Sequence, residues 1–191
     1  MERTAVQKLA KVLKILVLVM YVVNLLCLPL VPGMVVFRRD FSHALELWKW
    51  FTLGNGEGLT LLGIICIGAF RTVVEDLEIG LLSLFFWTCG VCTALILWQA
   101  KEVLDTVLEG EPFQMRNAET LNRAAVCCWV ISGAALVKLA LWLWMERNIA
   151  PLFTYTTLFI PAFLMAGLLF QVMSALFRQA AELKEDQDLT I

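Results

Sequence analysis

Charged side chains are missing from long runs of this 191-residue chain. None occurs in residues 15–37, 79–100 or 149–177, and residues 124–145 contain a single one, Lys138. A soluble domain of ordinary composition has no such runs, because it needs charges on its surface. About 20 apolar residues in a helix cover the ~30 Å hydrocarbon core, and in lipid each segment has to satisfy its own backbone groups. The missing charges therefore predict four membrane-spanning α-helices.

Histidine is nearly absent, which limits the chemistry available to the chain. The only one is His43, and no cluster of cysteine, histidine and carboxylate residues has the spacing of metal ligands. There is no glycine-rich phosphate loop, nucleophile elbow or pair of catalytic carboxylates. A net charge of −2 also disfavours the clustered basic face that binds nucleic acid. We therefore expect a non-enzymatic protein with no metal, no cofactor and no direct nucleic-acid binding.

Cysteine is missing from the polar segments, which argues against disulfides. The six cysteines all lie in apolar runs, where we expect them to pack as small hydrophobic side chains. One alternative function stays open, a membrane thiol oxidoreductase that uses Cys89 and Cys92 of a Cys-x-x-Cys sequence. Two features disfavour it: the pair lies in the middle of a charge-free run, where burial disfavours the thiolate, and the outer connections contain no second pair of cysteines.

The basic residues predict the orientation in the membrane. Nine of them lie before residue 15, between residues 101 and 123, and after residue 177, against five in the segments on the opposite side. By the positive-inside rule, both termini are expected in the cytoplasm, with the chain in the plasma membrane. The predicted fold is all-α, a four-transmembrane-helix bundle. It forms a single membrane domain over 1–191, with spans at about 15–37, 79–100, 124–145 and 153–177, an outer segment 38–78, a cytoplasmic connection 101–123 and a cytoplasmic tail 178–191.

The outer segment combines two patterns. Residues 40–53 place apolar side chains at helical spacing, which is typical of an amphipathic helix on the membrane surface. Residues 58–70 form an apolar run of 13 residues, too short to span comfortably, and the sequence leaves open whether it is interfacial, re-entrant or a fifth span. This gives a third functional alternative, a small immunity or ligand-binding membrane protein whose segment from Phe41 to Phe70 meets an extracellular ligand.

The cytoplasmic connection carries the most specific pattern. Residues 101–108 have an apolar stripe opposite their charges, which predicts an amphipathic extension of the second span. We expect this helix to end at Gly110, just before Pro112. Phe113 is apolar within a polar turn, so we expect it to contact either the protein's own helices or a partner. Asn117 is the predicted N-cap of the helix that becomes the third span.

The tail ends in an unusual way for a segment needed only for solubility. It is acidic from Glu182 to Asp188, and apolar residues follow these charges. Together with the connection, this predicts a partner-binding surface made of Pro112, Phe113, Asn117, Asp188, Leu189, Thr190 and Ile191. Small residues in the last two spans also allow close helix approach, namely Gly133, Ala134, Ala135, Ala162, Ala166 and Gly167. Whether the chain forms a homo-oligomer stays open.

The connection and the tail together resemble a bacterial membrane-protein family, domain of unknown function 2975. Pro112-Phe113, then Asn117 and Leu121, at the foot of a membrane helix are similar to the family's Pro-Phe…Asn…Leu connection. The ending Glu182–Ile191 is similar to the family's acidic ending, which closes in Asp-Leu-Thr and an aliphatic residue. The resemblance covers residues 79–191, and nothing about the outer segment can be carried over from it.

This resemblance implies four spans, cytoplasmic termini and no catalytic residues. Genes of the family often adjoin one for a small helix-turn-helix protein. The resemblance therefore implies a regulatory or sensory subunit that binds a cytoplasmic partner, such as a small helix-turn-helix regulator.

Overall fold

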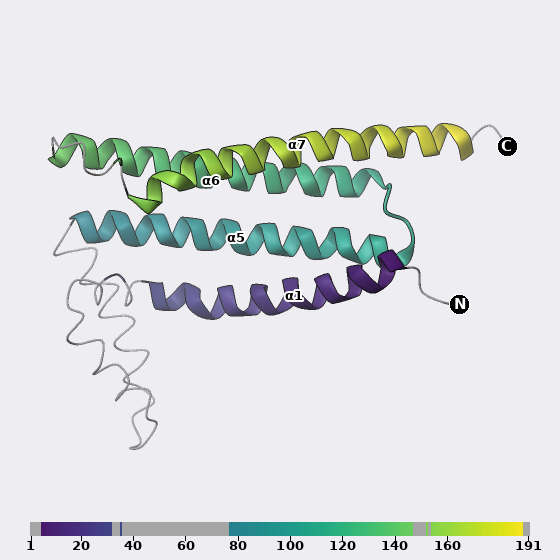
Figure 1. The fold of residues 1–191 in the computed structure, drawn as a ribbon, viewed down its shortest axis with the longest axis horizontal. Coiled ribbons are helices and arrows are strands. Elements are labelled where there is room, and N and C mark those ends of the chain that lie inside the picture. The colour runs from purple at the N-terminus through teal and green to yellow at the C-terminus, as the bar shows by residue number, and fades with distance from the viewer. Residues whose placement is uncertain (1–4, 32–34, 36–76, 147–151, 153, 189–191) are drawn as a thin grey trace, which may run out of the picture. The chain divides into compact units, whose positions relative to one another are not determined.

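The structure is a computed structural model that describes residues 5–31, 35, 77–146, 152 and 154–188. In these residues it contains four long α-helices, one 3-10 turn and no strand. The helices are α1 (Ala5–Cys27), α5 (Leu77–Glu109), α6 (Met115–Glu146) and α7 (Tyr155–Asp188), and the 3-10 turn Leu28–Leu30 follows α1 (Figure 1). All four helices are long and apolar enough to cross a membrane. The predicted all-α fold with four spans is confirmed, and the chain is a multi-pass membrane protein.

Several predictions fall on residues that the structure does not describe. The outer segment 38–78 is outside the described residues, apart from Leu77 and Glu78 at the start of α5. The same holds for the amphipathic helix at 40–53, for the apolar run 58–70 and for the tail end 189–191. A fifth span and an outer ligand surface therefore stay predictions.

A 3-10 turn interrupts the charge-free run predicted as the first span. The α-helix stops at Cys27, and the turn places Pro29 in its first positions before Val31, which has helical backbone angles. Proline has no N–H, so residue 29 cannot donate to the carbonyl of Leu25 as an α-helix requires. The span was predicted from the absence of charge, and the absence of charge does not indicate where a proline ends the α-helical hydrogen bonding.

The chain divides into two compact units, residues 25–90 and residues 1–24 with 91–191. In the smaller unit the side chain of Leu28 lies 3.5 Å from where a Cβ on Gly90 would be, which brings the 3-10 turn against α5. The larger unit contains α1 up to Asn24, α5 from Val91 onward, and all of α6 and α7. Its most buried side chains lie mainly on α6, namely Asn117, Ala118, Thr120, Ala124, Ala125, Cys128, Ile131 and Ala135.

Helices α6 and α7 pack along each other through small and hydroxyl side chains. Gly167 lies against the indole of Trp129. The hydroxyl groups of Ser132 and Ser174 on the two helices donate to the carbonyls of Ile160 (3.0 Å) and Ala118 (2.6 Å) across the interface. The close approach predicted at Gly167 is therefore confirmed. At Gly133 no atom of the described residues lies within 4 Å of where its Cβ would be, so no such approach is made there.

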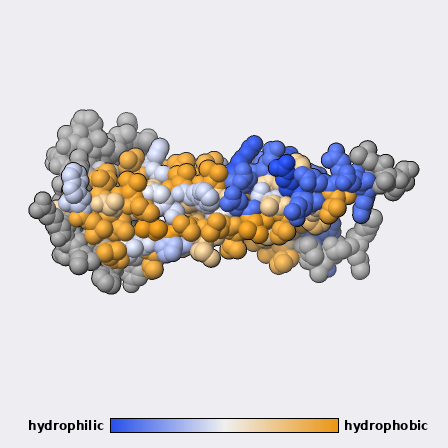
Figure 2. All heavy atoms as spheres, turned by 90° about the horizontal axis from the view of Figure 1, so that it is seen from above, coloured by the Kyte–Doolittle hydropathy of each residue, from blue (hydrophilic) through white to orange (hydrophobic). Residues whose placement is uncertain are grey.

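Three helices are longer than a bilayer requires. With 33, 32 and 34 residues, α5, α6 and α7 each extend over about 50 Å, against ~30 Å of hydrocarbon. In each the surplus is charged, and these charged parts lie at one end of the larger unit with the start of α1 (Figure 1). We call residues 8–14, 101–123 and 178–188 the polar end. Figure 2 shows hydrophilic side chains gathered at the polar end. Hydrophobic side chains cover most of the remaining coloured surface in the same view.

Candidate functional site at the α5–α6 connection

Helix α5 ends in a hydrogen-bonded turn that depends on one glycine. Gly110 has a φ of 88°, a left-handed conformation that glycine adopts without steric cost. Its N–H donates to the carbonyl of Val107 (3.3 Å), and the N–H of Glu111 donates to the carbonyl of Thr106 (3.1 Å). These two bonds form a Schellman motif, in which the last carbonyls of a helix find donors in the residues that follow it. The predicted end of this helix at Gly110 is confirmed.

A buried asparagine joins the two sides of the connection. The Asn117 side chain is 1% exposed, and its Nδ2 donates to the hydroxyl of Thr106 (2.6 Å) and to the carbonyl of Pro112 (2.7 Å). The Thr106 hydroxyl donates in turn to the carbonyl of Val103 (2.8 Å). Both amide hydrogens of Asn117 are thus used, one on α5 and one on the turn. We call this set of bonds the Thr106–Asn117 network.

The predicted N-cap role of Asn117 is wrong. Helix α6 begins at Met115, two residues earlier, and the backbone N–H of Asn117 already donates to the carbonyl of Gln114 (3.0 Å). An N-cap side chain would accept hydrogen bonds from its own helix, whereas this one donates to α5 and the turn. One feature of the sequence could have indicated this bond to α5, namely that Thr106 is a polar residue within the apolar stripe of that helix.

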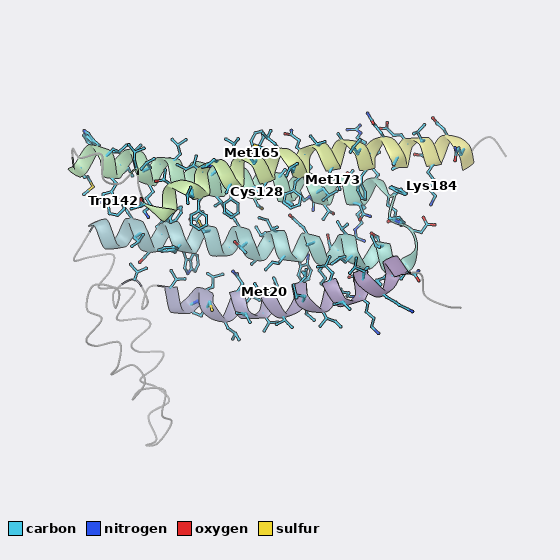
Figure 3. The ribbon with its side chains drawn as sticks, viewed as in Figure 1. Met20, Cys128, Trp142, Met165, Met173 and Lys184 are labelled. Atoms are coloured by element: carbon cyan, nitrogen blue, oxygen red, sulfur yellow. The ribbon has the colours of Figure 1, made fainter. Side chains whose placement is uncertain are left out.

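The connection is also attached to α7. The ring of Phe113 lies 5.7 Å from that of Phe177, centroid to centroid, and the planes are tilted by 46°. Lys184 Nζ and Glu111 Oε2 form an ion pair at 2.6 Å. Figure 3 shows Lys184 near the end of α7 that faces the connection. The predicted contact of Phe113 is confirmed with the protein's own helix, and 49% of the residue nevertheless stays exposed.

Two further ion pairs hold the helices in register at the polar end. Arg116 of α6 pairs with Glu102 of α5 (3.1 Å), and Lys14 of α1 pairs with Asp105 of α5 (2.5 Å). All four side chains are substantially exposed, so each pair contributes only about 0–1 kcal/mol. Their main effect is to place opposite charges of α1, α5 and α6 next to one another, which aligns these helices along their length.

The structure brings together only part of the predicted partner-binding set. Pro112 and Phe113 lie in the connecting turn, and Asn117 lies in the first turn of α6, where its side chain is buried. Asp188 ends α7, while residues 189–191 lie outside the described residues. Two more exposed apolar side chains lie at the polar end and were not in the predicted set, Met115 (40% exposed) and Leu183 (64% exposed).

The cysteines are arranged differently from a reactive pair on one helix. The five that the structure describes are free thiols. Cys92 on α5 and Cys127 on α6 share a hydrogen bond. Both are buried, as is Cys128 on α6. Cys89 is only half-buried. Within the described residues, no group of three histidine, cysteine or carboxylate side chains could hold a metal ion. This arrangement suits packing between α5 and α6.

Comparison with known proteins gives a match to a protein family. No curated protein and no solved structure matches the chain. The family model DUF2975, described as a protein of unknown function, matches residues 9–191. The match extends the resemblance seen at the connection and the tail to α1 and to the outer segment. Because it covers nearly the whole chain, this protein belongs to the DUF2975 family.

Proposed function

We propose that this protein is a non-enzymatic integral membrane protein that holds a cytoplasmic partner at its polar end. The observation that carries the proposal is Phe113, which stays 49% exposed on a connection fixed by the Thr106–Asn117 network and by the Glu111–Lys184 ion pair. An exposed aromatic side chain on a rigid support favours protein binding, because little conformational entropy is lost on association.

A small helix-turn-helix regulator is the partner that we propose. The resemblance to a family whose genes often adjoin one for such a protein supports this choice. The charge of α7 also supports it, since the last two turns contain Glu182, Glu185 and Asp186, all exposed. An acidic helix end next to an exposed phenylalanine complements a basic, partly apolar protein surface. In this proposal the membrane protein has a regulatory or sensory role, and binding keeps the regulator at the membrane.

The proposal requires the polar end to face the cytoplasm of the cell. The nine-to-five distribution of basic residues supports this orientation in the plasma membrane. We expect cysteines introduced by Glu119→Cys and Gln187→Cys to react with a membrane-impermeant maleimide only after the cells are permeabilised. A cysteine introduced by Asn55→Cys should react in intact cells. Labelling of the Glu119→Cys protein in intact cells would contradict the orientation and favour five spans.

Partner binding should depend on Phe113. We expect Phe113→Ala to lower the amount of captured partner at least fivefold, because the exposed aromatic ring is the centre of the proposed surface. The measurement is crosslinking in native membranes, affinity purification of the full chain and quantitative mass spectrometry of bound proteins. A deletion of Asp188–Ile191 tests the predicted contribution of the tail in the same way.

Phe159→Ala is the matched control for this experiment. Phe159 also forms an aromatic pair, with Phe163 at 5.6 Å between centroids, and is 38% exposed, but it lies near the start of α7, far along the helix from the polar end. It should leave capture within twofold of the unmodified protein at equal membrane abundance. If the bound proteins are identical for the unmodified chain, Phe113→Ala and the tail deletion, the proposal is wrong.

A further inference from the structure

A cavity of about 330 Å³ lies between the start of α1 and the end of α5, both within the larger unit. Its lining consists of Gln7, Lys11, Lys14, Ile15, Leu18 and Leu108. The lining is polar toward the N-terminus of α1 and apolar toward the middle of that helix. The cavity therefore has the amphipathic character of the boundary between headgroups and hydrocarbon.

The polar part of the cavity carries one positive charge that no group among the described residues offsets. Lys14 is paired with Asp105, so its charge is largely neutralised. Lys11 is exposed, and among the described residues it has no ion-pair partner. Gln7 adds an amide that can donate a hydrogen bond. These groups suit a ligand with a single anionic oxygen group, such as a phosphodiester.

The apolar part of the cavity opens toward the lipid. Ile15 and Leu18 begin the charge-free run of α1, and they are 56% and 45% exposed. Leu108 supplies the opposite wall from α5. From Lys11 to Leu18 the helix rises by about 10 Å, which is the scale of a lipid headgroup and the first part of its chain. A free inorganic anion would leave this apolar wall without a contact.

We propose that this cavity binds one anionic phospholipid. The Lys11 ammonium group holds the phosphate, the Gln7 amide donates to it, and the acyl chain lies against Ile15, Leu18 and Leu108. Basic pockets between membrane helices recognise anionic lipid headgroups by the same chemistry, and each lysine near the surface contributes about fivefold in affinity. The bound lipid would connect α1 to α5 beside the Lys14–Asp105 ion pair.

The test is native mass spectrometry of the delipidated full chain in detergent, titrated with phosphatidylglycerol or with phosphatidylcholine. We expect the first phosphatidylglycerol to bind about fivefold more tightly than phosphatidylcholine. Lys11→Gln should reduce this preference to within twofold. Lys8→Gln is the matched control, because Lys8 is also exposed, lies one turn away on α1 and does not line the cavity. It should keep the preference.

Three results would overturn the proposal. If the unmodified protein shows no preference between the two lipids, there is no anionic site. If Lys8→Gln and Lys11→Gln weaken binding equally, the attraction is a general effect of positive charge on α1. If millimolar inorganic phosphate displaces phosphatidylglycerol from the unmodified protein, the site binds a free anion and the apolar wall contributes nothing.

Discussion

Asn117→Ala is expected to lower the free energy of unfolding by about 2–3 kcal/mol. The substitution removes the donor to the Pro112 carbonyl and to the buried Thr106 hydroxyl, and an unsatisfied buried acceptor costs about 1–3 kcal/mol. It also leaves a gap beside a side chain that is 1% exposed. Denaturant unfolding in detergent micelles, followed by circular dichroism, measures the change. Thr106→Val should reproduce part of it by removing the hydroxyl at nearly constant size.

Asn122→Ala provides the matched control on the same helix. Asn122 is exposed on α6, so its replacement should change the free energy of unfolding by no more than about 0.5 kcal/mol. In the double variant Thr106→Val with Asn117→Ala, the loss should be smaller than the sum of the single losses, since both remove the same hydrogen bond. Equal losses for Asn117→Ala and Asn122→Ala would show that the Thr106–Asn117 network does not stabilise the connection.

The local part of this site was predictable from the sequence. The end of α5 at Gly110 follows from the conformational freedom of glycine and from the nearby Pro112, and both act within a few residues. The charge-free runs predicted the spans because lipid excludes unpaired charges along a whole segment. Each of these properties is determined by neighbours in the chain.

The partners of the site residues were not predictable in the same way. Asn117 is a good N-cap by residue type, but it bonds instead to α5 and to the turn. The type of a residue gives its donors and acceptors and does not give the segment that supplies the partner. Phe113 was expected to make a contact, yet the choice of Phe177 depends on how α7 lies along α6. That placement comes from packing between helices distant in sequence.

The packing of α7 against α6 should be highly sensitive to substitution of Gly167. We expect Gly167→Val to lower the free energy of unfolding by about 2–3 kcal/mol, because added atoms would overlap the Trp129 indole. The new Cβ would also lie 3.3 Å from the carbonyl of Ala125, a backbone atom that cannot rotate away. Gly133→Val is the matched control on an exposed face of α6, and it should change the stability by no more than about 0.5 kcal/mol, since that site is open.

The effect of Gly167→Val should also reach the polar end. Helix α7 carries both Phe177 and Lys184 to the connection, so a shift of α7 on α6 removes the support of Phe113 and Glu111 together. Adding Trp129→Ala should recover part of the stability, because the indole is half-exposed and its removal frees space for the valine. Partner capture should fall with Gly167→Val, stay unchanged with Gly133→Val and return partly in the double variant. If Gly167→Val leaves stability and capture unchanged, the α6–α7 contact at Trp129 does not position the connection.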